Sequence, residues 1–167
     1  MDHQRQLIIV RHGKSSWSYD SIADIDRHLK EKGIHDAYTM AERLKKNRIF
    51  PELIMSSPAP RALHTALIFA RTLNHPLSKI QLQDNFYHGD ENDVLDIIRQ
   101  AQKNIGSLMI FGHNPTFTDL ANLFLSDPLE KLPTTGMASI EFKAGEWEKI
   151  GREKVVREWT DSPKKNK

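Results

Sequence analysis

The sequence contains no cysteine at any of its 167 positions. This absence excludes disulfide bonds, a thiolate nucleophile and zinc sites built from cysteine. A long apolar run is also missing, because the longest one covers only residues 66–70 and a membrane-spanning helix needs roughly 20 such residues. Residues 1–6 are mostly polar and do not resemble a signal peptide. We therefore expect a cytoplasmic protein without a membrane partner.

A strong charge of one sign is missing from most of the chain. The sequence carries 24 lysines and arginines against 22 aspartates and glutamates. Three of the lysines stand in the last six residues, which hold no acidic residue, so that residues 1–161 total −1. A body this close to neutral gives no support for a nucleic-acid partner. The length fits one domain, which we expect over residues 1–161, followed by a basic, solvated tail over residues 162–167.

The pattern that is present alternates between strands and helices. Short apolar runs predict buried strands at residues 7–10, 53–55, 80–82 and 108–111. Apolar residues at intervals of three and four predict amphipathic helices at residues 34–44, 63–73, 94–105 and 117–124. Asp90 is expected to cap the third helix, and Asn114, followed by Pro115, the fourth.

The last part of the chain differs from this pattern. After a turn at residues 133–136, apolar and polar residues alternate over 138–142 and again over 155–159. Such alternation predicts antiparallel edge strands. The expected fold class is therefore α/β: a single three-layer α/β/α domain with a largely parallel central sheet and antiparallel edge strands.

Polar residues follow three of the predicted strands at their carboxyl ends, where open α/β sheets bind ligands. Residues 11–13, Arg-His-Gly, leave the first strand. Residues 56–58 leave the second strand and lead to Arg61, and residues 112–114, Gly-His-Asn, leave the fourth. Two arginines and two histidines are therefore expected to meet at one edge of the sheet.

This combination suits phosphoryl chemistry. Two guanidinium groups match the oxygens of a tetrahedral phosphoryl group, and the helix N-terminus beside His113 and Asn114 adds backbone N–H donors. An imidazole placed in line, such as that of His12, can attack phosphorus and form phosphohistidine. Neighbouring arginines are expected to lower the pKa of His12, and Gly13 to let the backbone approach the phosphate. We expect no metal, because the arginines oppose a divalent cation and no His-Glu-x-x-His spacing occurs, and no cofactor.

Five segments, in the same order along the chain, resemble the histidine phosphatase superfamily, which is also called phosphoglycerate mutase-like. Within it they are similar to the SixA-type branch of small phosphohistidine phosphatases. The segments are residues 7–13 (LIIVRHG), 14–17 with 24–29 and 32–33, 56–62 with 65–66, 112–115 and 132–136. The resemblance implies a phosphoglycerate mutase-like fold and His12 as the nucleophile. It implies a catalytic set of Arg11, His12, Arg61 and His113; the expected substrate-binding set is Arg11, Gly13, Arg61, His113 and Asn114.

Two departures from the family pattern stand out. His28 occupies a position where this branch usually has proline. Relatives that act on phosphate esters carry a glutamate after the third strand as proton donor, and residues 83–90 contain none at the expected place. Asp84 and His88 are the candidate replacements, with Asp90 as a third. Each of them also fits a turn or cap position.

The leading hypothesis is a phosphatase that hydrolyses phosphohistidine, on a phosphorylated protein, or a small phosphorylated molecule through an intermediate on His12. One alternative is a phosphoglycerate mutase-like phosphotransferase, which needs a second phosphate site. The other is a non-catalytic module that binds phosphorylated ligands. A role with nucleic acid would rest on the basic tail alone.

Overall fold

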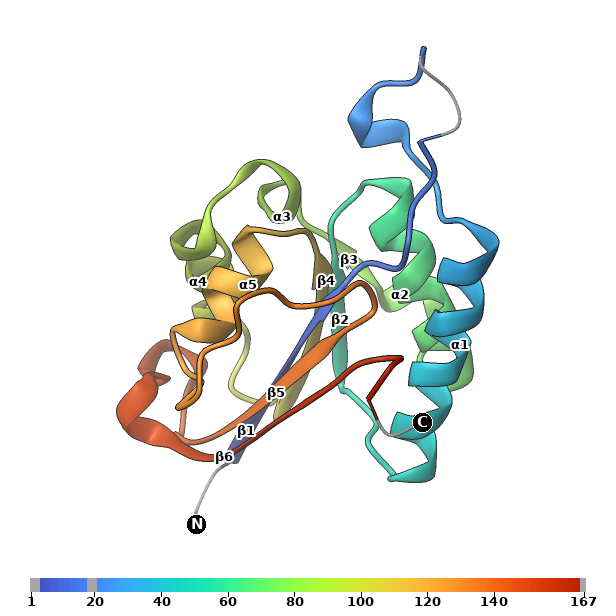
Figure 1. Cartoon of the computed structure of the whole chain (residues 1–167). Coiled ribbons are helices and arrows are strands. Elements are labelled where there is room, and N and C mark those ends of the chain that lie inside the picture. The colour runs from blue at the N-terminus through green and yellow to red at the C-terminus, as the bar shows by residue number, and fades with distance from the viewer. Residues whose placement is uncertain (1–3, 18–20, 166–167) are drawn as a thin grey trace.

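The computed structural model describes residues 4–17 and 21–165, which form one six-stranded sheet between two layers of helices (Figure 1). The strand order is β3-β2-β4-β1-β5-β6, in which the first four strands run parallel, β5 pairs antiparallel with β1, and β6 pairs antiparallel with β5. This confirms the expected fold class. The strands are β1 (Gln4–Arg11), β2 (Leu53–Ser56), β3 (Gln81–Leu82), β4 (Ser107–Gly112), β5 (Met137–Lys143) and β6 (Val155–Asp161).

The helices cover both faces of the sheet because β1 is apolar on both sides. Leu7 and Ile9 pack into the cluster formed with α4 and α5, whereas Ile8 and Val10 pack into the cluster formed with α1 and α2. The continuous apolar run of the first strand therefore serves two cores. The helices are α1 (Glu31–Lys46), α2 (Pro60–Thr72), α3 (Asn85–His88), α4 (Glu91–Arg99) and α5 (Thr116–Asn122). None of the helices in residues 4–17 and 21–165 has the length and apolar character to span a bilayer.

Two helix boundaries differ from the sequence-based expectation. α4 begins at the Asp90 cap as expected, with a capping box completed by Asp93, but it ends at Arg99 instead of continuing to Ile105. The chain turns there to enter β4, and Gly106 accepts a hydrogen bond from the β1 backbone. The short helix α3 was not expected.

α5 begins one residue later than expected. Its N-cap residue is Pro115, not Asn114. The Asn114 side chain accepts from the backbone N–H of Thr118 (3.2 Å) and from its hydroxyl (2.8 Å). It thus still holds the first turn of the helix from one position further out.

The described part of the basic tail is held against the protein. Arg43 of α1 pairs with Asp161 at 3.2 Å and donates to the carbonyl oxygens of Ser162 (2.8 Å) and Pro163 (3.4 Å). The Lys165 ammonium donates to the Thr160 carbonyl at 3.0 Å. This differs from the expected solvated tail. Residues 166 and 167, like residues 1–3 of the expected domain, lie outside the described residues.

Candidate active site

Three strands deliver the expected polar residues to one pocket. The ends of β1 and β4 are level because Arg11 pairs with Gly112, and β2 ends beside them because Ser56 pairs with Phe111. The side chains that follow these ends therefore converge, as expected for an α/β sheet. They line a pocket of about 460 Å³ together with residues of the loop before α1. The expected site residues found in its wall are Arg11, His12, Arg61, His113 and Asn114.

Gly13, which we expected to bind the phosphate, does not lie in the pocket wall. Its backbone N–H donates to the Thr65 hydroxyl at 3.0 Å, so it is already used within the protein. A Cβ atom at this position would lie 3.0 Å from the Gly33 carbonyl oxygen and 3.2 Å from Leu29. The close approach that Gly13 allows is therefore toward α1, and Gly13 does not line the pocket.

His12 is held as a neutral ring with one free nitrogen. Its Nδ1 lies 2.6 Å from the carbonyl oxygen of Gly13, and because a carbonyl only accepts, Nδ1 carries the proton. The pKa of His12 is lowered to about 4, mainly by burial and to a smaller extent by the charges of Arg61 and Arg11, against the hydrogen bond to the Gly13 carbonyl, which raises it. The arginine effect expected from the sequence is thus present but smaller than that of burial. At neutral pH the lone pair of Nε2 is available for attack.

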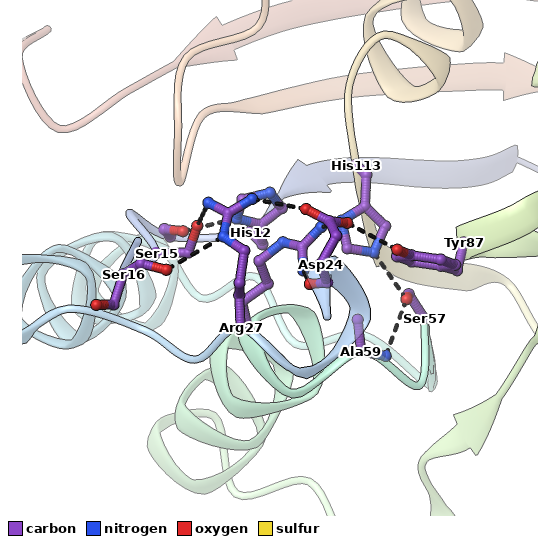
Figure 2. A network of polar contacts seen from close by, with 11 residues as sticks. His12, Ser15, Ser16, Asp24, Arg27, Ser57, Ala59, Tyr87 and His113 are labelled. Carbon is purple, nitrogen blue, oxygen red and sulfur yellow. Dashed lines mark hydrogen bonds and ion pairs between the residues drawn. The ribbon is translucent and has the colours of Figure 1, made fainter. Parts of the chain in front are cut away.

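His113 lies beside His12, with 5.1 Å between the ring centroids (Figure 2). Its Nε2 is 2.8 Å from the Ser57 hydroxyl oxygen, which also accepts from the backbone N–H of Ala59 at 3.2 Å. The Ser57 hydroxyl proton is then directed to Nε2, which leaves the ring proton on Nδ1. Burial, followed by the charges of His12 and Arg61, lowers the pKa of His113 to about 3.

The turn before β5 closes the pocket from the C-terminal half of the chain. The carbonyl oxygen of Leu132 accepts from Arg11 Nη1 at 3.0 Å and from the Asn114 side-chain amide at 2.9 Å. The backbone N–H of Thr135 lies 3.0 Å from the carbonyl oxygens of both Arg11 and His12. The turn thus fixes an arginine and the backbone of the expected nucleophile together.

Three buried nitrogens around this pocket have no hydrogen-bond partner among the described residues: Arg11 Nε, Arg61 Nε and His113 Nδ1. Arg5 Nε, Arg99 Nε and His75 Nε2 are also without a partner among the described residues, but only the three nitrogens named here belong to residues that line this pocket together, where an external partner can pair with them. An oxyanion is such a partner, because its oxygens accept from several N–H groups and the two guanidiniums balance its charge.

Asp24 is a component of the site for which the sequence analysis predicts no role. Its carboxylate contacts Arg27 at 2.8 Å, Arg61 at 3.1 Å and the Tyr87 hydroxyl at 2.7 Å, and its carbonyl accepts from Arg61 at 2.7 Å (Figure 2). The hydrogen bond from Tyr87, and then that from Arg27, hold the pKa of Asp24 well below its usual range. The carboxylate is therefore ionised at neutral pH.

Arg27 fixes the loop that carries Asp24. It donates to the Ser15 hydroxyl and to the Ser16 carbonyl (3.1 Å), and its guanidinium lies over the Trp17 ring, 3.1 Å from the centroid. The spacing of three residues between Asp24 and Arg27 is the one signal in the sequence that points to their ion pair. No comparable pattern marks Tyr87.

The expected proton donors do not lie in the pocket. Asp84 is the exposed N-cap residue of α3, and His88 is exposed at the end of the same helix, where its ring contacts Tyr87. Neither lines the pocket, and Asp90 caps α4. The short helix α3 turns these side chains away, so their candidate role as acids is not supported by their position.

Within residues 4–17 and 21–165, no group of three or more histidine, cysteine, aspartate or glutamate residues is placed so that it could hold a metal ion.

The lowered pKa values of His12 and His113 predict an unusual titration. A ring with a pKa of about 4 or 3 stays neutral from about pH 8 to pH 5, whereas a peptide histidine takes up its proton near 6.5. Ring-nitrogen NMR signals, assigned by their loss in His12→Ala and His113→Ala, should therefore not shift over this range. The lowered pKa values also make the protein less stable as the pH falls. Below about pH 6.5 the unfolded chain binds these two protons while the folded protein does not, so the free energy of unfolding decreases. A His12 midpoint above pH 6 would contradict the neutral nucleophile.

Comparison with known proteins shows which family the sequence matches. Residues 7–104, more than half of the chain, match the histidine phosphatase superfamily (branch 1). An uncharacterised chloroplast protein of Arabidopsis thaliana is 30% identical over 152 residues, which cover 86% of this chain and 69% of that protein. An uncharacterised protein of Mycobacterium tuberculosis is 30% identical over 149 residues, which cover 83% and 89% of the two chains.

Solved structures show the same fold. The putative phosphohistidine phosphatase SixA from Agrobacterium tumefaciens is 29% identical with a TM-score of 0.75, and the match covers 83% of this chain and 92% of that one. The protein histidine phosphatase SixA complexed with tungstate is 23% identical with a TM-score of 0.78, over 95% and 97% of the two chains.

Proposed function

The chain belongs to the histidine phosphatase superfamily, and from this membership we propose that it is a phosphatase that forms phosphohistidine on His12. The observation that carries the proposal is the set of three unpartnered buried nitrogens in residues that share a pocket with His12. Arg11, Arg61 and His113 bind the phosphoryl oxygens, and Asn114 helps to hold Arg11 through their shared carbonyl acceptor.

In the first step, the lone pair of His12 Nε2 forms a bond to phosphorus. The bond from phosphorus to the leaving group breaks, and its electron pair departs with the leaving group. The Nδ1–H bond to the Gly13 carbonyl stabilises the positive charge that develops on the ring. The two guanidiniums and His113 Nδ1–H stabilise charge on the phosphoryl oxygens during transfer.

In the second step, a water oxygen attacks phosphorus. The nitrogen–phosphorus bond breaks and its electron pair returns to Nε2, while a proton from the water passes to solvent. Inorganic phosphate leaves and His12 is neutral again. The low pKa of His12 favours this step, because the enzyme returns to the uncharged ring.

Phosphohistidine is the proposed substrate class because neither Asp24 nor the two histidines of the pocket offer a proton to an alkoxide. Asp24 is ionised, and Asp84 and His88 lie outside the pocket. General acid catalysis contributes typically about 10²- to 10⁴-fold, so alkyl esters lose this factor. A phosphorylated imidazole is protonated on its free nitrogen near neutral pH and then departs as neutral imidazole. Such a substrate supplies its own proton.

The test compares kcat/KM for phosphohistidine with kcat/KM for an alkyl phosphate, in the wild type and in His88→Ala. We expect phosphohistidine to be preferred by about 10²-fold or more, and His88→Ala to change neither value. Better turnover of the alkyl ester, together with its selective collapse in His88→Ala, would identify His88 as an acid and end the proposal. Turnover of either substrate to free phosphate separates the phosphatase from a binding module, and from a mutase, which returns a phosphorylated isomer.

A further inference from the structure

A second pocket of about 310 Å³ adjoins the pocket that contains His12 and that we propose binds the phosphoryl group. The two share Lys14 and Thr134 as wall residues. We call the second one the tail pocket, since the C-terminal tail forms one of its walls. Its residues are Lys14, Lys32, Asp36, Pro133, Thr134, Ser162, Pro163 and Lys164.

The wall that the tail forms, residues 162–164, is held in place by hydrogen bonds to its backbone. Arg43 of α1 pairs with Asp161 and donates to the carbonyl oxygens of Ser162 and Pro163. These bonds hold Asp161, Ser162 and Pro163 against α1, and the next residue, Lys164, lines the pocket. The tail, for which the sequence suggested no role, thus adds a wall and a cation next to the active site.

The tail pocket has an excess of positive charge. Its one acidic residue, Asp36, is buried and paired with Lys32 at 3.2 Å. Lys14 and Lys164 are exposed, and neither forms an ion pair within residues 4–17 and 21–165. The ring carbons of Pro133 and Pro163 supply apolar contact beside these cations. A ligand that fits this wall has an apolar part and an anionic group.

We propose that the tail pocket is a subsite for the leaving group of the substrate and that Lys14 and Lys164 bind a carboxylate or a second phosphate on that group. The inference rests on the proposed function only for the placement of the phosphoryl group beside His12. Lys14 and Thr134 line both pockets, and of the two Lys14 is the cation beside a group that extends from one pocket into the other. The anion is either a side chain of a phosphorylated protein or part of a small molecule.

Non-hydrolysable phosphonates test the subsite without catalysis. Calorimetry on the full chain at low salt compares 3- and 4-carboxyphenylphosphonate with their carboxamide twins, which differ in charge but hardly in size. We expect the better carboxylate to bind about fivefold more tightly than its twin, the upper range for partly exposed ion pairs, and the ratio to shrink in about 0.5 M salt. The ratio should approach one in Lys14→Gln combined with Lys164→Gln, and stay unchanged in the control Lys79→Gln, an exposed lysine of the turn before β3.

Equal affinity for carboxylate and carboxamide in the wild type overturns the inference, as does a ratio that survives the double lysine variant. Turnover of phosphohistidine tests the proposed function separately. If phosphohistidine is hydrolysed while the phosphonate ratio is one, only the subsite fails; if the ratio holds while phosphohistidine is not hydrolysed, only the phosphatase fails. A phosphohistidine peptide flanked by glutamate, compared with its glutamine twin, assigns the anion to a protein when the glutamate form is preferred. A preference confined to the aryl compounds assigns it to a small molecule.

Discussion

Replacement of His12 by alanine is expected to lower turnover by more than about 10⁴-fold, the scale on which removal of a nucleophile acts in other enzymes. His113, the other histidine among the described residues of the pocket, does not take its place, because its Nε2 is engaged by Ser57. The fold should persist, since the His12 side chain follows the end of β1 and contacts the Gly13 backbone instead of either apolar cluster.

The covalent intermediate gives a second measurement. Wild-type protein quenched during turnover should carry one phosphoryl group on a His12 peptide, labile in acid and stable in alkali as a phosphoramidate is. His35→Ala, which alters an exposed histidine of α1, is the matched control and should keep both the label and the rate. Near-normal activity in a well-folded His12→Ala protein would show that another group attacks phosphorus.

Replacement of Arg61 by lysine is expected to reduce kcat by about 10²-fold or more, the scale for one preorganised donor. Both terminal nitrogens of Arg61 are held by Asp24, so the guanidinium is fixed with its buried Nε free for a ligand. A guanidinium has three nitrogens, so two can bond to Asp24 while the third contacts the phosphoryl group. A lysine side chain has a single nitrogen and cannot make all of these contacts.

The control for this prediction lies on the same helix. Arg71→Lys alters an exposed arginine whose recorded partner is the Tyr38 hydroxyl, and it should leave the rate unchanged. The measurement is kcat from steady-state kinetics on both variants, with thermal unfolding to verify that each is folded. A wild-type kcat in Arg61→Lys would eliminate the fixed guanidinium as a source of transition-state stabilisation.

Local patterns were sufficient to predict the sheet and the convergence at its edge. The run over residues 7–10 can only be a strand buried on both faces, and parallel strands bring their carboxyl ends together whatever the loops do. Arg11 and His113 follow strand ends directly, so their meeting was predictable from the sequence. The resemblance to a family added the nucleophilic role of His12, which geometry alone does not assign.

The remaining parts of the site depend on contacts between distant residues. Asp24 reaches Arg61 and Tyr87 across 37 and 63 residues, and no local pattern encodes such a meeting. Gly13 illustrates the same limit. We expected its lack of a side chain to let the backbone approach the phosphate, whereas its close neighbour in the structure is Gly33 of α1. The end of α4 at Arg99 is likewise set by where the chain must enter β4.

The turn before β5 has a consequence for the protein while it is being made. Arg11 and the Leu132 carbonyl that holds it are 121 residues apart, and the backbone of His12 is bonded to Thr135 of the same turn. A nascent chain therefore exposes its future nucleophile long before the ribosome has produced the turn that completes the pocket. Fragments that end before residue 135 contain His12 without this enclosure, so the proposed phosphoryl transfer requires a chain that extends through the turn before β5.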